Sequence, residues 1–166
     1  MPCLERACHH CRFNFDGLLS FDTWSDGRSG SAYAQAFRNG AAEFVDVSTL
    51  TGAVQQQVLP VTLIEKSVIR GLTEYVRVMG DLGVTPPLVV MPSLLGVLGC
   101  HIVRGHRALP TSVPTDRNDL LLPDVLVEDE GTDAAQLLRP AFDALWQAAG
   151  WRGSQSYDEH GRWVES

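Results

Sequence analysis

One stretch, from Leu59 to Gly99, constrains the fold of this chain more than any other part of the sequence, and it begins with a long amphipathic segment. Its apolar residues recur at steps of three or four, the spacing that places side chains on one face of an α-helix. They are Val61, Ile64, Val68, Leu72, Tyr75, Met79 and Leu82. An apolar face of this length must pack against a core, so the segment predicts a long helix that covers the interior of a folded domain.

The sequence also predicts where this helix begins and ends. Pro60 suits a first helical turn, and Thr62 with Glu65 has the spacing of a capping box. Gly83 favours the left-handed conformation that ends helices, and the proline pair that follows prevents continuation. We therefore expect Thr62 and Glu65 to cap the helix at its N-terminus.

Two short apolar runs follow the helix. Residues 88–91 and 94–98 are too short to cross a membrane and too apolar to lie exposed, so they predict buried strand. Pro92, Gly96 and Gly99 interrupt this region, which favours bulges or a bend over an unbroken central strand.

A hairpin is predicted before the helix. The dipeptide Asn39-Gly40 lies between two strand-like segments, and it is the strongest short hairpin signal because a type I′ turn needs positive φ at both central residues. A two-residue loop would set Ala36 opposite Glu43.

Two further strands are predicted near the ends of the chain. Residues 12–21 indicate a first strand with an irregularity at Gly17, and residues 120–127 indicate a last strand in which Pro123 favours an edge or a bulge.

A second amphipathic helix follows the last strand. Thr132 or Asp133 would cap it, and Gly150 would end it. Pro140 lies within the helical pattern, where its ring removes one backbone hydrogen bond, so we expect a kink or a restart around Arg139.

These elements predict an α+β fold in two layers. Consecutive strands favour a mostly antiparallel sheet, here of about five to six strands, covered by the two amphipathic helices. Residues 12–151 would form this single domain, with a Cys/His-rich tail over residues 1–11 and a polar tail over residues 152–166. A chain of 166 residues is long enough to bury a sizeable core.

The charge balance narrows the classes of partner. The chain has 13 Lys and Arg against 20 Asp and Glu, a formal net charge of −7. Nucleic acids and anionic membranes both require net neutralisation of phosphate, so we expect no direct binding to either. Because neither a signal peptide nor a run as long as a spanning helix stands out, we expect a cytoplasmic protein.

Three of the four cysteines lie within the first dozen residues. Cys8 and Cys11 have the spacing that lets two thiolates reach one zinc ion, and Cys3 is a candidate third ligand. A fourth ligand would come from the two histidines between Cys8 and Cys11, or from the distant Cys100-His101 pair. The alternative is a solvated tail without metal. Zinc is the one cofactor that the sequence leaves open.

The most basic patch of the chain precedes the loop at residues 110–114. Together with one hairpin residue, its members are the candidate ligand-binding residues: Arg38, Arg104, His106 and Arg107, with His101 beside them. They would suit an anion. The alternative interpretation is an exposed strand end that binds nothing.

An enzyme would need acid and base groups near a nucleophile. The candidates are Asp16, Glu65, His101, His106 and Asp116. No spacing brings two of them onto one element beside a nucleophile. We therefore predict a non-catalytic protein, with a pocket built from Asp16, His101, His106 and Asp116 as the enzymatic alternative.

Five phrases of the sequence carry a family resemblance. In chain order they are Arg12-Phe13-Asn14-Phe15-Asp16-Gly17, Phe37-Arg38-Asn39-Gly40, Ser93-Leu94-Leu95-Gly96-Val97, Leu120-Leu121-Leu122-Pro123 and Leu138-Arg139-Pro140-Ala141-Phe142-Asp143-Ala144-Leu145-Trp146. Together they resemble the C-terminal region of bacterial Schlafen-like AlbA proteins, which are described as DNA-binding or ATP-binding proteins and as transcriptional regulators. The resemblance covers nearly all of residues 12–163, whereas the first eleven residues and Pro92 depart from it.

The resemblance implies a sensory or interaction module that accompanies a DNA-binding domain. In that family the DNA-binding or nucleotide-binding role belongs to an N-terminal AlbA-type domain, which would precede the region that this chain resembles. The role therefore does not carry over to these residues. The expected partner is an AlbA-type domain or another protein.

Overall fold

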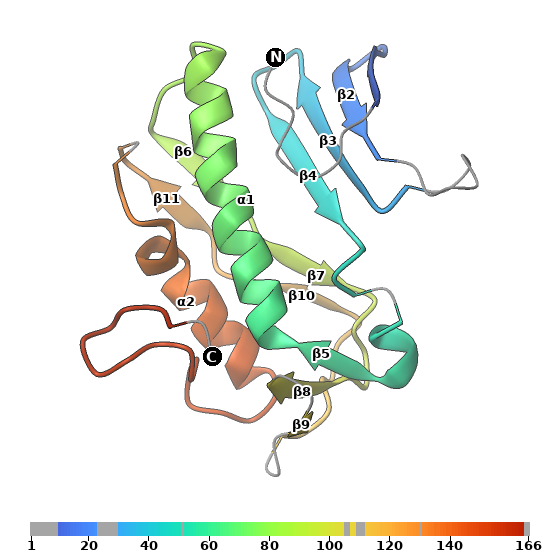
Figure 1. Cartoon of the computed structure of the whole chain (residues 1–166), viewed down its shortest axis with the longest axis vertical. Coiled ribbons are helices and arrows are strands. Elements are labelled where there is room, and N and C mark those ends of the chain that lie inside the picture. Colours follow the sequence, from blue (N-terminus) through green and yellow to red (C-terminus); the bar gives the residue numbers. More distant parts are fainter. Residues whose placement is uncertain are drawn as a thin grey trace.

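The computed structural model has a mixed α+β fold, as the sequence predicts (Figure 1). It describes residues 10–22, 30–50, 52–104, 107–108, 112–129 and 131–164. Helices α1, Val61–Asp81, and α2, Ala134–Gln147, pack against each other and against short strands. These strands are mostly antiparallel, and in the described residues they form several small sheets rather than one continuous sheet.

Helix α1 ends as the sequence predicts. Gly83 has a φ angle of 80°, in the left-handed region. Its N–H donates to the Gly80 carbonyl at 2.9 Å, and the Val84 N–H donates to the Met79 carbonyl at 2.9 Å. These two bonds are the Schellman pattern, which satisfies the last carbonyl groups of a helix and turns the chain away from its axis.

The start of α1 differs from the prediction. Pro60 occupies the N-cap position and makes no side-chain capping bond, so the capping box of Thr62 and Glu65 is wrong. Both side chains are buried, at 8% and 0% exposure. Strand β5, Val58–Pro60, leads directly into the helix. The first turn of α1 therefore lies inside the protein, where these two side chains face other residues instead of a solvated helix end.

Four antiparallel strands form an N-terminal sheet beside α1 (Figure 1). In chain order they are β1, His10–Phe13, β2, Gly17–Phe21, β3, Ala32–Phe37, and β4, Ala42–Asp46. The prediction of a single strand over residues 12–21 is therefore wrong. Asn14 causes the reversal, because its N–H donates to the Gly17 carbonyl at 2.9 Å and its Oδ1 accepts the Gly17 N–H at 2.8 Å.

The β3–β4 hairpin forms where it was predicted, with a different register. Ala36 pairs with Ala42 instead of Glu43, because the Phe37 N–H donates to the Ala41 carbonyl at 2.9 Å and leaves three residues, 38–40, in the turn. The N–H of Arg38 in this loop donates to the carbonyl of Asp16, in the β1–β2 turn, at 2.9 Å. The β3–β4 hairpin therefore adopts a register that the Asn39-Gly40 dipeptide alone did not specify. A hydrogen bond to the β1–β2 turn accompanies this register.

The N-terminal sheet is fixed to α1 through β4. The Ser67 hydroxyl donates to Asp46 Oδ2 at 3.1 Å. Asp46 also accepts the Ser48 N–H and hydroxyl and the Thr49 hydroxyl. One turn farther along the helix, the Phe44 ring lies over Gly71, where an added Cβ would meet the ring at 3.8 Å. The sheet therefore contacts the helix through one charged and one aromatic side chain of its last strand.

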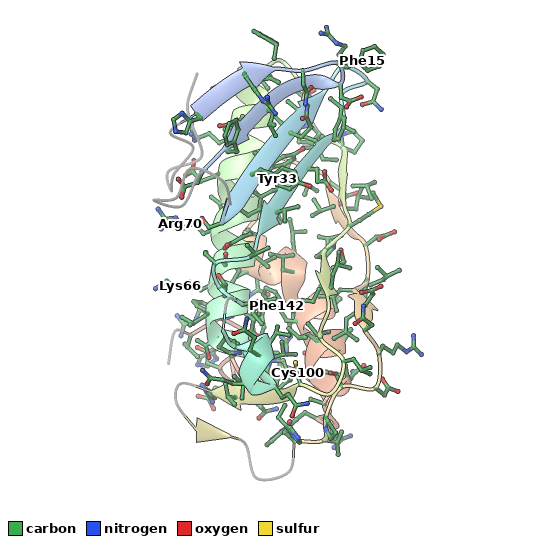
Figure 2. All side chains as sticks on the ribbon, turned by 90° about the vertical axis from the view of Figure 1, so that its right-hand side faces the viewer. Phe15, Tyr33, Lys66, Arg70, Cys100 and Phe142 are labelled. Carbon is green, nitrogen blue, oxygen red and sulfur yellow. The ribbon has the colours of Figure 1, made fainter. Side chains whose placement is uncertain are left out.

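Four short strands form an antiparallel ribbon on the side of the molecule away from α1 (Figures 1 and 2). Strand β6, Leu88–Val90, pairs with β11, Val125–Val127, and β7, Ser93–Leu95, pairs with β10, Asp119–Leu121. The two pairs continue one another where the Leu122 N–H donates to the Pro92 carbonyl at 3.0 Å. We call these four strands, with their connecting residues, the ribbon.

A third sheet lies at the N-terminal end of α1 (Figure 1). A 3₁₀-helix, Val54–Gln56, leads into β5, which pairs in parallel with β8, His101–Arg104. Strand β8 pairs antiparallel with β9, Arg107–Ala108. The connection from β5 to β8 therefore includes all of α1, β6 and β7.

The core lies between the two helices and the inner side of the ribbon. Asp133 caps α2, since its Oδ1 accepts the Ala135 N–H at 2.9 Å, and the helix continues through Pro140 without a restart. The apolar side of α2 packs against α1 and the ribbon through fully buried residues: Leu138, Ala141, Phe142, Leu145 and Trp146. Among the described residues, neither helix combines the length and the apolar character that a membrane crossing needs.

Candidate functional site

Of the three predicted zinc ligands, the part of the chain that the structure describes contains Cys11 alone. Cys3 and Cys8 lie outside it, and Cys11 is exposed on β1, with its Sγ 3.2 Å from Ser20 Oγ. Cys100 is buried far from the N-terminal sheet (Figure 2), and burial raises the pKa of its thiol. Within the described residues, no group of three or more His, Cys, Asp or Glu side chains could hold a metal ion.

The candidate ligand-binding residues fall at two separate places. Arg38 is exposed in the β3–β4 loop, where its Nε donates to the Phe15 carbonyl at 3.2 Å. Arg104 ends β8 at the opposite end of the molecule, and its backbone pairs with that of Arg107 in β9. His106 lies outside the described residues. Arg104 and Arg107 are therefore neighbours in the fold, while Arg38 belongs to another region.

The acid and base candidates are also spread along the molecule. Asp16 follows Phe15 in the β1–β2 turn, whereas His101 follows Cys100 at the start of β8, and Figure 2 shows Phe15 and Cys100 at opposite ends. Asp116 lies on the segment beside β8, since the N–H of the preceding residue donates to the Cys100 carbonyl at 2.9 Å. Asp116 and His101 therefore belong to two neighbouring segments, and Asp16 is remote from both.

Glu65 is different, because its carboxyl group lies in the core with no exposure to solvent. Its Oε1 accepts the Trp146 indole N–H at 2.8 Å and the Ser154 hydroxyl at 2.9 Å, and its Oε2 accepts the Trp163 indole N–H at 3.1 Å. Three donors offset the cost of burying the group. The carboxyl group joins α1, α2 and the C-terminal segment at one point.

In the sequence, the capping-box spacing led us to expect Glu65 at the helix N-terminus and not as a buried hydrogen-bond acceptor. A signal for it was nevertheless present, since Glu65 lies four residues after Val61 and three before Val68. Those steps place its side chain on the apolar face of the helix. A carboxyl group in that position must find donors in the core, and the sequence does not reveal which residues supply them.

The segment after α2, expected as a polar tail, packs on the core. The Tyr157 hydroxyl donates to the Ala135 carbonyl at 2.6 Å, and the Arg139 guanidinium lies 5.0 Å from the centre of the Tyr157 ring. Burial, together with the carboxyl groups of Glu65 and Asp143, raises the pKa of Tyr157 well above its ordinary value. This tyrosine therefore remains a neutral hydrogen-bond donor, and residues 152–164 belong to the domain.

A small hollow lies between α1, β11 and the first turn of α2. Its volume of about 50 Å³ has room for a few water molecules. The lining is mostly apolar with three polar side chains: Leu72, Thr73, Val76, Val127, Asp129, Thr132, Ala134 and Leu137. Its size suits ordered solvent better than an organic ligand.

The outer side of the ribbon carries exposed apolar side chains. Val89 lies opposite Leu126, and Leu121 lies opposite Ser93, across the antiparallel ladders. Exposure ranges from 48% for Leu126 to 80% for Leu121. We call the five side chains on this side the outer apolar face: Val89, Met91, Leu95, Leu121 and Leu126.

The prediction of buried strand therefore holds for only one side of the ribbon. Leu94, Leu120, Val125 and Val127 point inward and are buried, because successive residues of a strand alternate between its two faces. An apolar run without polar alternation predicts burial on both faces. In the described residues no further layer covers the second face, so the sequence pattern and the exposure disagree there.

Comparison of the chain with family models, with curated proteins and with solved structures gave no match.

Proposed function

We propose that this protein is a cytoplasmic, non-catalytic interaction module that binds a protein partner through the outer apolar face of the ribbon. The observation that carries the proposal is the exposure of five large apolar side chains on one side of two short strand pairs and their connection. Scattered apolar residues are ordinary on protein surfaces, whereas a contiguous group of this size is typical of interaction sites.

The geometry of the ribbon supports contact with a macromolecule. Along a strand each residue advances about 3.3 Å, so the stretch from Val89 to Leu95 extends for roughly 20 Å. With the facing strand it makes an apolar surface on the order of several hundred Å², in the range of functional patches. A surface of this shape suits a second protein better than a small molecule, which needs a concave site.

The buried Glu65 gives the module its rigidity in this proposal. With no exposure and three hydrogen bonds from protein donors, its carboxyl group has no open side toward a substrate. The hydrogen bonds instead hold α1, α2 and the C-terminal segment together behind the ribbon. Strands that pack on such a core are already ordered, so binding through them costs little conformational entropy.

The resemblance to the C-terminal region of Schlafen-like AlbA proteins suggests one partner. An AlbA-type DNA-binding domain would then be held against the outer apolar face, and this chain would contribute contact surface rather than DNA affinity. Another protein with an apolar docking surface would fit the same face.

Site-specific photocrosslinking in cells tests the function. A photo-reactive phenylalanine analogue replaces Leu121 on the outer apolar face or, as a matched control, Leu63, which is 57% exposed on α1. We expect a discrete crosslinked product from position 121 and none from position 63. Mass spectrometry of the product identifies the partner and shows whether it carries an AlbA-type domain.

Two results would overturn the proposal. One is the same set of products from both positions, which would indicate random collisions of exposed side chains. The other is the lack of any product from position 121 when analogues at Val89 and Leu126 also give none. Circular dichroism of each purified variant shows beforehand that the substitution has left the protein folded.

A further inference from the structure

Carboxyl groups alternate with leucines along two consecutive strands of the ribbon. On β10, β11 and their flanks the exposed residues are Asp119, Leu121, Asp124, Leu126 and Glu128. All five are exposed, while the residues between them on the strands are buried. The acidic groups therefore share the surface on which the apolar contact would form.

The strands that pair with β10 and β11 differ from them in charge. Residues 88–98 on β6 and β7 contain no charged side chain, whereas residues 118–129 contain four acidic and no basic side chains. The outer apolar face thus has one apolar edge and one acidic edge. A partner that covers it must bring counter-charges to the acidic edge, because carboxyl groups that lose water without a partner cost free energy.

We propose that the partner of the outer apolar face is a protein segment with an apolar centre flanked by lysine or arginine on one side. This inference rests on the proposed function and specifies the chemistry of the same surface. The apolar centre would lie over Val89, Met91 and Leu95. The basic flank would lie over Asp124 and Glu128, where it forms charge-assisted contacts at the rim.

A second copy of this chain fits the face less well. In a two-fold dimer the same surface meets itself, so Asp124 and Glu128 of both copies would be brought into one interface. Like charges that face each other across an interface disfavour association. With the −7 net charge of the whole chain, self-association through this face is opposed at both short and long range.

Three synthetic peptides test the inference on the full-length protein. They share a leucine- and valine-rich centre and differ only in their flanks, which are lysine, serine or glutamate. Affinity is measured by fluorescence anisotropy at low and at near-physiological salt, and chemical-shift perturbation locates the contact. We expect the lysine-flanked peptide to bind ~10-fold or more tightly than the glutamate-flanked peptide, with a smaller ratio at higher salt.

Two variants separate the charges from the apolar contact. The double substitution Asp124→Asn with Glu128→Gln should lower the lysine-to-glutamate ratio several-fold while leaving affinity for the serine-flanked peptide unchanged. Its control, Asp16→Asn with Glu159→Gln, removes the same charge from exposed positions elsewhere and should keep the ratio. Leu121→Ser should weaken binding of all three peptides.

The outcomes distinguish the two proposals. Equal binding of the lysine and glutamate peptides to the native protein would overturn the basic partner and leave the interaction surface standing. Binding that is insensitive to Leu121→Ser, or that maps outside the ribbon, would overturn the surface itself. Failure of every peptide to bind, or dimerisation through the ribbon in sedimentation experiments, would overturn the basic partner in favour of another occupant.

Discussion

The Trp146 indole N–H donates to the Glu65 carboxyl group at 2.8 Å, across 81 residues of sequence. This contact joins the two helices inside the core, and Ser154 and Trp163 extend it to the C-terminal segment. Every donor around the carboxyl group comes from a later part of the chain. The first turn of α1 therefore reaches its native environment only when α2 and the segment beyond it have packed.

The Glu65 contact predicts a specific pattern of mutational coupling. Glu65→Gln keeps one accepting oxygen for Trp146 and Ser154 but turns an amide NH₂ toward the Trp163 N–H, so two donors would face each other. We expect a loss of about 1–3 kcal/mol in the free energy of unfolding. Adding Trp163→Phe removes the opposing donor, so the double variant should lose less than the sum of the single losses.

Urea denaturation followed by circular dichroism measures these losses, since substitution of a tryptophan alters the fluorescence signal. Ser154→Ala serves as a control that removes one donor without creating a donor pair. Strict additivity of Glu65→Gln and Trp163→Phe would mean that Glu65 and Trp163 do not contact each other in solution.

The packing of α1 can be tested at two leucines with opposite environments. Leu72 is 6% exposed and faces the core, whereas Leu63 is 57% exposed on the same helix. Leu72→Ala should cost about 2–5 kcal/mol in the free energy of unfolding, because it leaves a cavity beside the existing hollow. Leu63→Ala should change it by less than about 0.5 kcal/mol. Equal denaturant midpoints for the two variants would contradict the orientation of the helix.

Asp46 predicts part of the acid sensitivity of the fold. Burial by itself raises the pKa of Asp46, but hydrogen bonds from Ser48, Thr49 and Ser67 together hold it below its ordinary value of 3.8. A carboxyl group with a lowered pKa in the folded state stabilises the protein above its unfolded pKa, and this stabilisation is lost as the pH falls through the folded pKa.

We therefore expect the free energy of unfolding of the native protein to fall below about pH 4 more steeply than that of Asp46→Asn. Urea titrations at a series of pH values measure both slopes. Ser67→Ala should reduce the difference, since it removes the bond between β4 and α1. Parallel pH profiles for the native protein and Asp46→Asn would show that Asp46 titrates alike in the folded and unfolded states.

For zinc we predict that the purified protein carries no stoichiometric metal. Cys100, one of the candidate fourth ligands, is fully buried at the other end of the fold from β1, so it cannot complete a site with Cys11. Elemental analysis should find well below one zinc per chain, and a chelator should leave the melting temperature unchanged. Zinc near one per chain that disappears in a Cys8→Ser, Cys11→Ser variant would instead establish a site in the N-terminal segment.

Direct DNA binding should be negligible. The chain has a net charge of −7, and its basic patch near Arg104 and Arg107 is small. Proteins built for non-specific binding reach roughly 10⁻⁴–10⁻⁶ M at physiological salt, and this chain should bind at or beyond the weak end of that range. Fluorescence anisotropy with labelled duplex and single-stranded DNA measures it. Sub-micromolar affinity that charge reversal at Arg104 and Arg107 abolishes would contradict the prediction.

Features that depend on neighbouring residues could be predicted from the sequence. Gly83 ends α1 and Asp133 caps α2, because each of these signals acts through backbone groups within a few residues. The long apolar repeat predicted α1 for the same reason. The α+β class followed from the order of such elements along the chain.

Contacts between distant parts of the chain determined the turn at Asn14, the register of the β3–β4 hairpin and the exposure of one side of the ribbon. Residues 12–21 fold back as a hairpin at Asn14, and the β3–β4 register accompanies a bond from Arg38 to the turn that this hairpin creates. The apolar runs of the ribbon predicted burial on both sides, yet one side is exposed because no other element of the described residues packs on it. Local periodicity specifies which residues share a face, and only the packing specifies what covers that face.

Glu65 shows this division most clearly. The sequence placed it on the apolar side of a helix and also in a capping pattern, and both descriptions use residues within one turn. Its donors lie on Trp146, Ser154 and Trp163, more than 80 positions away. A buried carboxyl group is stable only where distant donors converge on it, so its role is decided by the tertiary structure and not by its neighbours in the chain.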